Sequence, residues 1–174
     1  LLLDDVLARL RGLGEVEVDG KPADVGRAAA ILEAWDRRFD IDSVGAVVWR
    51  ELLASFTLEQ RNDAGPLFAE GYDPEDPVLT PRGLAPAPES GPDPLVIALG
   101  RAVHALTGAG IDIDARLGDV QYVERGGRHW PIHGGYEIEG IANVIASVGT
   151  LARADLQPGP DLPDPVPGRT ELTG

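Results

Sequence analysis

The stretch VGRAAAILEAWDRRFDIDSVGAVVWRELLASF, residues 25–56, decides the fold. Its apolar residues recur at intervals of three and four, which is the spacing of one face of a helix. The pattern predicts one helix over 25–37 and a second over 44–56, joined by a short turn into a helical hairpin. The side chains expected to face inward are Val25, Ala28, Ala29, Ile31, Leu32, Trp35, Val44, Val47, Val48, Leu52 and Phe56.

Short polar residues precede both predicted helices. Asp24 stands before the first, and Asp42 or Ser43 before the second. The side-chain oxygens of Asp and Ser accept hydrogen bonds from first-turn N–H groups, so these residues are expected N-caps. The same spacing predicts further helices over 1–13 and over 94–106. Their inward residues are expected to be Leu3, Val6, Leu7, Leu10, Leu95, Leu99, Ala102, Val103 and Leu106.

Alternating residues predict short β-hairpins beside these helices. Residues 15–18 are followed by the tight-turn pair Asp19-Gly20, and residues 119–133 form a strand, a Gly-containing turn and a second strand. Residues 66–94 contain eight prolines, which exclude a long helix or a central strand, so we expect an extended crossing that lies on another part of the protein.

The fold class is therefore α+β, a mostly helical segment with short β-hairpins. We expect one organised segment over 1–148 and a Pro-rich, incomplete stretch over 149–174. The chain begins with Leu1 and not Met, and it has no basic and apolar leader, so we expect a fragment of a longer protein.

Composition excludes several classes of function. The 15 basic and 29 acidic residues give a net charge of −14, which argues against a broad face that binds nucleic acid or anionic lipid. No apolar run is long enough to span a bilayer. The absence of Cys excludes disulfides, thiolate catalysis and Cys-based metal sites within these residues.

The histidines favour plain roles. His129 and His133 are four residues apart, a spacing that can bind a metal on a helix, but Pro131 lies between them in a predicted hairpin. A surface or loop role is therefore expected for both. His104 lies off the apolar stripe of its helix and is expected on the polar face.

The paired acids are equally ordinary. Asp40 with Asp42, and Asp112 with Asp114, lack the Gly turn and distant Glu of a calcium loop, so turn and capping roles are expected. The glycine pairs do not open a helix after a strand, and no nucleophile-elbow motif surrounds a serine. We assign no catalytic, cofactor-binding or metal-binding residue within this chain, and no cofactor.

Three stretches carry a family resemblance. The first is 30–51, with the string W-D-x-R-x-x-x-D-S-x-G-A from Trp35; the second is 94–117; the third is 117–145, with H-G-G from His133. In order and spacing they resemble the β-subunit of the penicillin acylase family, near the branch of acyl-homoserine lactone acylases and aculeacin-type acylases. The resemblance covers roughly 1–148.

The resemblance implies an N-terminal-nucleophile hydrolase with an αββα core, made as a precursor that cleaves itself. It implies hydrolysis of a linear amide that removes an acyl chain from a penicillin-like or N-acyl-homoserine-lactone-like substrate. The nucleophile would be a Ser at the start of the β-subunit, outside this chain. Asn143 matches a family Asn in a G-x-x-N-V string, but we do not equate it with the oxyanion residue. The implied partners are the rest of the β-subunit and the α-subunit, with no nucleic acid or membrane, in the periplasm or outside the cell.

Within this frame the W-D-x-R string is expected to play a structural role, its charged residues pairing and capping around a turn at Phe39. The hairpin over 119–133 is the better candidate for a wall of the acyl or leaving-group pocket, because its glycines allow close approach of a neighbouring backbone. Two alternatives stay open: a non-catalytic, acidic, Pro-rich interaction module of another protein, and a carboxylate-dependent glycosidase.

Overall fold

A computed structural model describes residues 2–125 and 128–134 of the chain, with the side chains of 123–125 left out. The expected boundary between 148 and 149, Asn143 and the Pro-rich stretch over 149–174 lie outside the described residues. For these parts the expectations from the sequence stay predictions.

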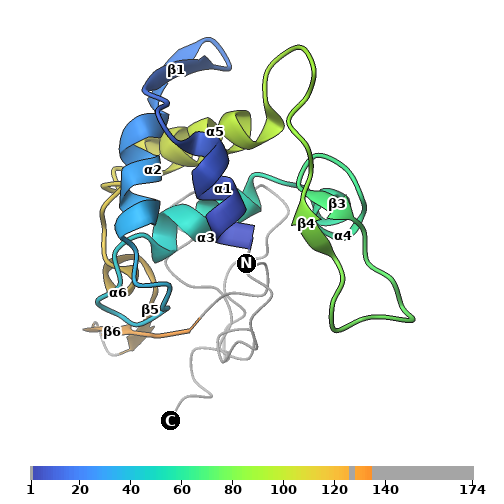
Figure 1. Cartoon of the computed structure of the whole chain (residues 1–174). Helices are drawn as coiled ribbons and strands as arrows, with labels where there is room; N and C mark the ends of the chain where they lie inside the picture. Colours follow the sequence, from blue (N-terminus) through green and yellow to red (C-terminus); the bar gives the residue numbers. More distant parts are fainter. Residues whose placement is uncertain (1, 126–127, 135–174) are drawn as a thin grey trace.

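Helices and short strand pairs follow one another along the chain (Figure 1). The strands form three separate two-stranded antiparallel sheets, β1–β2, β3–β4 and β5–β6. This arrangement confirms the α+β class. The elements are α1 (Leu2–Leu10), β1 (Glu15–Val18), β2 (Lys21–Asp24), α2 (Val25–Ala34), α3 (Ala46–Ala54), α4 (Leu58–Asn62), β3 (Phe68–Glu70), β4 (Arg82–Leu84), α5 (Pro94–Gly108), α6 (Leu117–Val120), β5 (Tyr122–Arg125) and β6 (Arg128–Pro131).

The hydrophobic core lies between α1, α2, α3 and α5, which are gathered into one body in Figure 1. Helix α3 is its centre, since every residue from Ala46 to Leu53 is buried, and it packs against α5. The β1–β2 hairpin lies on α5, where Gly100 leaves no room for a side chain: a Cβ there would be 2.5 Å from Cγ2 of Val18.

Most of the predicted inward residues are buried, which confirms the four helical stripes. Asp24 is confirmed as the N-cap of α2, because its side chain accepts a hydrogen bond from the Arg27 N–H. The confirmed core residues are Leu3, Val6, Leu10, Val25, Ala28, Leu32, Trp35, Val47, Val48, Leu52, Phe56, Leu95, Leu99, Ala102, Val103 and Leu106; Leu7, Ala29 and Ile31 are half-buried. The prediction that Val44 faces inward is wrong, because Val44 lies in the loop before α3 and is exposed.

The predicted short turn between the first two helices is wrong. Helix α2 ends at Ala34 and α3 begins at Ala46, so a long loop over 35–45 joins them. The predicted caps Asp42 and Ser43 are also wrong, since the N-cap of α3 is Gly45, which has a φ of 100° and no side-chain cap.

Two further predictions need correction. Residues 119–120 belong to the short helix α6 and not to a strand, because the Gln121 N–H closes a helical turn onto the Leu117 carbonyl. The Pro-rich crossing does not lie flat along its whole length. It forms the β3–β4 pair, and the segment between these strands projects away from the body (Figure 1).

Two exposed ion pairs link distant parts of this fold, Arg101 with Asp19 and Arg37 with Asp4, and a third, Arg116 with Asp119, is local to the start of α6. In each pair the hydrogen bond from the guanidinium holds the pKa of the carboxyl below its ordinary value of 3.8.

These pairs predict an acid-sensitive contribution to stability. A carboxyl whose pKa is lower in the folded protein stabilises it above the unfolded pKa, and this contribution is lost as the pH falls through the folded pKa. The contribution of these pairs to thermal stability should therefore be fully present and constant between about pH 5 and 8, and it should be lost progressively below about pH 4. Asp19→Asn should flatten the acid limb of that curve, and an unchanged limb would show that the Arg101 pair contributes nothing.

Candidate functional site

The loop over 35–45, which carries most of the W-D-x-R string, is held by the segment 116–134. The Leu117 N–H donates to the Ser43 carbonyl at 3.0 Å, the Gly118 N–H to the Ile41 carbonyl at 2.8 Å, and the Gly134 N–H to the Phe39 carbonyl at 2.7 Å. Two stretches that are separated by some seventy residues in the sequence are thus joined along their backbones.

Gly118 makes this contact possible. A Cβ at this position would lie 2.9 Å from Cβ of Ile41 and 3.0 Å from Cβ of Pro131. The loop and strand β6 therefore meet at a residue without a side chain. The sequence prediction named the glycine pairs of the hairpin and not Gly118; an added Cβ at Gly134 would meet no atom within 4 Å, and residues 126–127 lie outside the described part of the chain.

Aromatic packing fixes the inner side of the loop. The Trp35 ring meets Phe39 edge-on with a centroid distance of 5.3 Å, and lies 6.2 Å from the Trp49 ring of α3. Its indole N–H donates to the Arg38 carbonyl at 2.9 Å. Buried indoles need such a partner, so Trp35 both fills the core and orders the turn.

Part of the pairing predicted for the charged residues of the W-D-x-R string lies within the loop, but Asp42 pairs with Arg116 outside it, and Arg37 pairs with Asp4 of α1. The Asp36 carboxylate accepts from the Arg38 N–H and from the Ser43 hydroxyl, both at 3.0 Å. The Ser43 hydroxyl is therefore engaged by Asp36, which explains why it does not cap α3.

A buried polar group lies where α3 meets α6. Arg50 and Glu51 of α3 have side chains that are only 1% and 5% exposed, and Arg50 Nε lies 3.2 Å from Glu51 Oε1. Arg50 Nη1 donates to Gln121 Oε1 at 3.1 Å. A buried ion pair persists only when further hydrogen bonds satisfy its charges, and Gln121 supplies one of them.

Gln121 extends this group to the end of the hairpin. Its side-chain amide donates to the carbonyls of Ile132 and Gly134, each at 2.9 Å, and its backbone carbonyl accepts from the Ile132 N–H at 3.0 Å. One fully buried amide therefore fixes residues 132–134 against α3. Sequence reasoning missed Gln121, since its partners are remote in the chain and no local pattern marks it.

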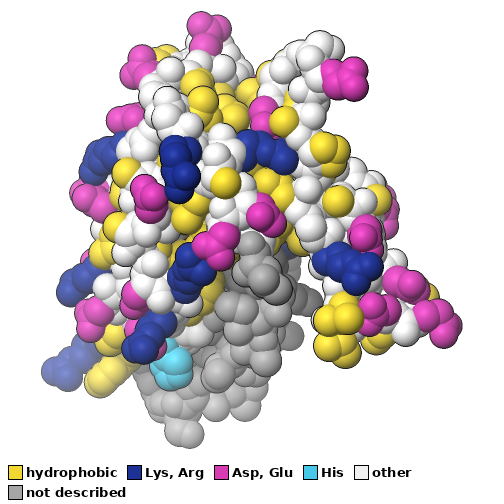
Figure 2. Space-filling view, viewed as in Figure 1, with side chains coloured by type: hydrophobic (Ala, Val, Ile, Leu, Met, Phe, Trp, Pro, Cys, Tyr) yellow, Lys and Arg dark blue, Asp and Glu magenta, His cyan; other side chains and the backbone are white. Residues whose placement is uncertain are grey.

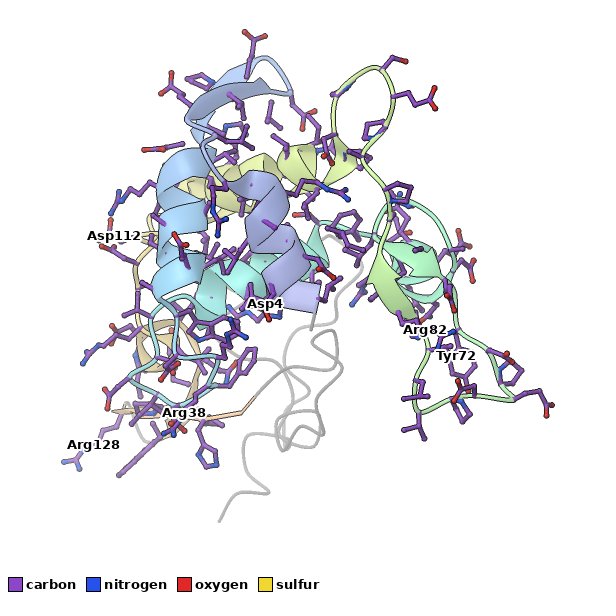
Figure 3. All side chains as sticks on the ribbon, in the orientation of Figure 1. Asp4, Arg38, Tyr72, Arg82, Asp112 and Arg128 are labelled. Carbon is purple, nitrogen blue, oxygen red and sulfur yellow. The ribbon has the colours of Figure 1, made fainter. Side chains whose placement is uncertain are left out.

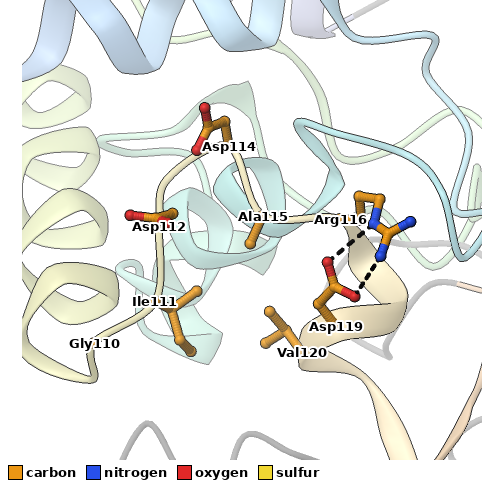
Figure 4. Close-up of a pocket in the computed structure, with 8 residues that line it drawn as sticks. All are labelled: Gly110, Ile111, Asp112, Asp114, Ala115, Arg116, Asp119 and Val120. Carbon is orange, nitrogen blue, oxygen red and sulfur yellow. Dashed lines mark hydrogen bonds and ion pairs between the residues drawn. The ribbon is translucent and has the colours of Figure 1, made fainter.

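A pocket of about 530 Å³ opens beside the same segment (Figure 4). Figure 4 shows Arg116 turned toward Asp119, with the guanidinium donating to both carboxylate oxygens at 3.0 and 2.9 Å. Arg116 also lies 3.5 Å from Asp42 of the loop. At the Arg116 side of the pocket, the charged groups of Arg116, Asp119 and Asp42 are therefore paired with one another. The lining residues are Gly110, Ile111, Asp112, Asp114, Ala115, Arg116, Asp119 and Val120.

The histidines take the plain roles predicted for them. His129 is exposed on β6, stacked on Tyr122 at 4.0 Å, and His133 is exposed in the loop that follows. His104 is half-buried on α5, where Nε2 lies 2.9 Å from the Pro22 carbonyl oxygen. Among the described residues, the three histidine side chains do not form part of a group that could hold a metal ion.

The paired acids serve turns and ion pairs, but they cap no helix. The backbone carbonyls of Asp40 and Asp112 accept from N–H groups three residues later, both at 3.0 Å. Asp114 pairs with Arg27 at 3.2 Å. Over 2–125 and 128–134, no group of three or more acidic or histidine side chains could hold a metal ion.

Comparison with known proteins decides the family. The family model described as penicillin amidase matches residues 1–159. The chain belongs to the penicillin amidase family. The penicillin amidase match contains both stretches that meet at Gly118 and Gln121, so the contact between the loop and the hairpin joins two parts of one family segment.

Relatives within the family are acylases by name. An acyl-homoserine lactone acylase PvdQ of Pseudomonas fluorescens is 29% identical over 148 residues, which are 84% of this chain and 18% of that protein. An aculeacin-A acylase of Actinoplanes utahensis is 32% identical over 170 residues, which are 97% of this chain and 19% of that protein. The chain thus spans less than a fifth of the length of these relatives.

Proposed function

We propose that residues 1–174 belong to the β-subunit of an amide hydrolase of the penicillin amidase type. The parent enzyme would remove the acyl chain from a penicillin-like or N-acyl-homoserine-lactone-like amide. The family match over 1–159 carries the proposal, and the names of the acylase relatives support it. Membership of this family speaks against the interaction module of an unrelated protein and against the glycosidase.

The nucleophile in this proposal is an N-terminal Ser that lies outside residues 1–174. Its free α-amine has a reference pKa near 8, so it can take the hydroxyl proton at neutral pH without a histidine. The other partners would be the remainder of the β-subunit and the α-subunit. A periplasmic or extracellular location follows from the family resemblance alone. No helix among the described residues has the length and apolar character needed to cross a bilayer.

The part of this chain would be to hold the segment 117–134 in place as a wall of the acyl or leaving-group pocket. The contacts of Gly118 and Gln121 support this role, because they fix the segment against the loop and α3. Exposed apolar side chains lie on the loop and on β6, namely Ile41, Val44 and Trp130, which are 39%, 39% and 54% exposed. Apolar surface of this kind suits an acyl chain.

The proposal predicts a difference between the chain alone and its parent. Purified residues 1–174 should release no acid from an acyl-homoserine lactone or from penicillin G, because the nucleophile is absent, whereas the complete reading frame should hydrolyse at least one of them. The parent with its β-subunit N-terminal Ser changed to Ala is the matched control for contaminating amidases. Steady turnover by the purified chain would contradict the placement of the nucleophile.

A further inference from the structure

The segment between β3 and β4, residues 71–81, projects from the body as an arm (Figures 1 and 3). Hydrogen bonds within the arm fix its shape. The Thr80 hydroxyl accepts from the Asp73 N–H at 2.8 Å and donates to the Asp76 carbonyl at 2.7 Å. The Asp73 side chain accepts from the Glu75 N–H at 2.8 Å. We call this segment the arm.

The base of the arm is clamped as well. Arg82 Nε donates to Glu70 Oε2 at 2.7 Å across the β3–β4 pair. Gly71 is pressed against the end of α4, since a Cβ there would lie 2.6 Å from the Ala64 nitrogen. An arm that is ordered at its tip and at its base is presented in one conformation, so it can dock without a large loss of conformational entropy.

The arm carries apolar side chains into solvent. Tyr72, Val78 and Leu79 are 53%, 88% and 60% exposed. Figure 2 shows hydrophobic side chains beside acidic ones at this end of the molecule. Single exposed apolar residues are common, but three on one ordered projection mark a contact surface.

The charge of the arm indicates what it contacts. Residues 71–81 include three acids and no Arg or Lys: Asp73, Glu75 and Asp76. A binding surface for this arm therefore needs an apolar groove for Val78 and Leu79 and basic side chains at its rim. The chain as a whole is strongly acidic, with a net charge of −14, which disfavours a second copy as the partner.

We infer that the arm docks into an apolar groove with a basic rim on the part of the acylase that lies outside residues 1–174. The inference rests on the proposed function, which places this chain inside a larger enzyme. The relatives are long enough to carry such a surface, because the residues aligned with this chain cover only 18% and 19% of their lengths. Docking would bury the apolar residues that this chain leaves exposed and pair the acids that surround them.

The test uses the protein from the complete reading frame. In hydroxyl-radical footprinting, Tyr72, Val78 and Leu79 should be labelled several-fold more slowly than their exposure in this chain predicts. Val78→Asp and Leu79→Asp should each lower the melting temperature. Leu58→Asp is the matched control: Leu58 is 67% exposed on α4, outside the arm, and its substitution should have a much smaller effect.

The outcomes separate the inference from the proposed function. Full labelling of the arm in an enzyme that hydrolyses acyl amides would overturn docking and leave the proposed function standing. An arm protected from labelling in a protein without amidase activity would support docking and overturn the proposed function. If Leu79→Asp instead converts a dimer into monomers in sedimentation, the arm contacts a second copy and the inference is wrong.

Discussion

Arg50→Ala should lower the free energy of unfolding by about 3–5 kcal/mol, the usual cost of breaking a buried ion pair by removing one partner. The Arg50 side chain is 1% exposed. Its removal deletes the positive charge beside Glu51 and the hydrogen-bond donor to the side-chain oxygen Oε1 of Gln121. The buried Glu51 carboxylate would lose the charge that lies 3.2 Å from it. Chemical denaturation of the 174-residue chain, followed by tryptophan fluorescence, measures the loss.

Two comparisons isolate the effect of burial. Arg101→Ala removes an Arg that also pairs with a carboxylate, but its side chain is 52% exposed, so a much smaller loss is expected. The double substitution Arg50→Met with Glu51→Leu removes both charges and should cost less than Arg50→Ala, because no buried charge loses its partner. If Arg50→Ala costs no more than Arg101→Ala, the pair does not stabilise the fold as we describe.

Gly45→Ala should be the second most damaging change. Gly45 has a φ of 100°, and a Cβ would lie 2.6 Å from Cβ of Trp35. Backbone and side chain of Trp35 are held by the core, so the clash should cost about 1–3 kcal/mol. Positive φ adds about 1–2 kcal/mol for a residue with a side chain. The midpoint of urea unfolding should fall accordingly.

Gly110→Ala separates these two costs. Gly110 also has a positive φ, of 72°, but no atom lies within 4 Å of an added Cβ. Only the backbone cost should appear there. Equal losses at Gly45 and Gly110 would mean that Trp35 yields to the added methyl group, and that the loop over 35–45 is less firmly packed than the contact implies.

The features that depend on residues close together in the sequence could be predicted from it. The apolar stripes of α1, α2, α3 and α5 were predictable because helical spacing sets which side chains share a face. Asp24 was predictable as a cap because its partner lies three residues away. Helix α4 could have been found in the same way, since Thr57 and Gln60 form a capping box.

The loop over 35–45 could not be predicted in this way. Its shape depends on contacts between residues that are not neighbours in the sequence. The Asp36 carboxylate accepts a hydrogen bond from the Ser43 hydroxyl, and the backbone N–H groups of 117–118 donate to carbonyls of the loop. The intrinsic preference of Ser for N-cap positions favoured Ser43 as the cap of α3, but its hydroxyl donates to the Asp36 carboxylate instead. The same holds for Gln121, whose partners are Arg50 and the end of the hairpin.

The most direct test of the central claim is made on the parent protein. Expressed from the complete reading frame, it should cleave itself, and the subunit that contains residues 1–174 should begin with Ser on N-terminal sequencing. In the precursor this Ser has no free amine, so its hydroxyl attacks the preceding peptide bond, and cleavage then frees the amine that serves as the base toward substrate. We predict that Ser→Ala leaves an uncut precursor without amidase activity. A Ser→Ala protein that still separates into two subunits, or still hydrolyses an acyl amide, would contradict the account.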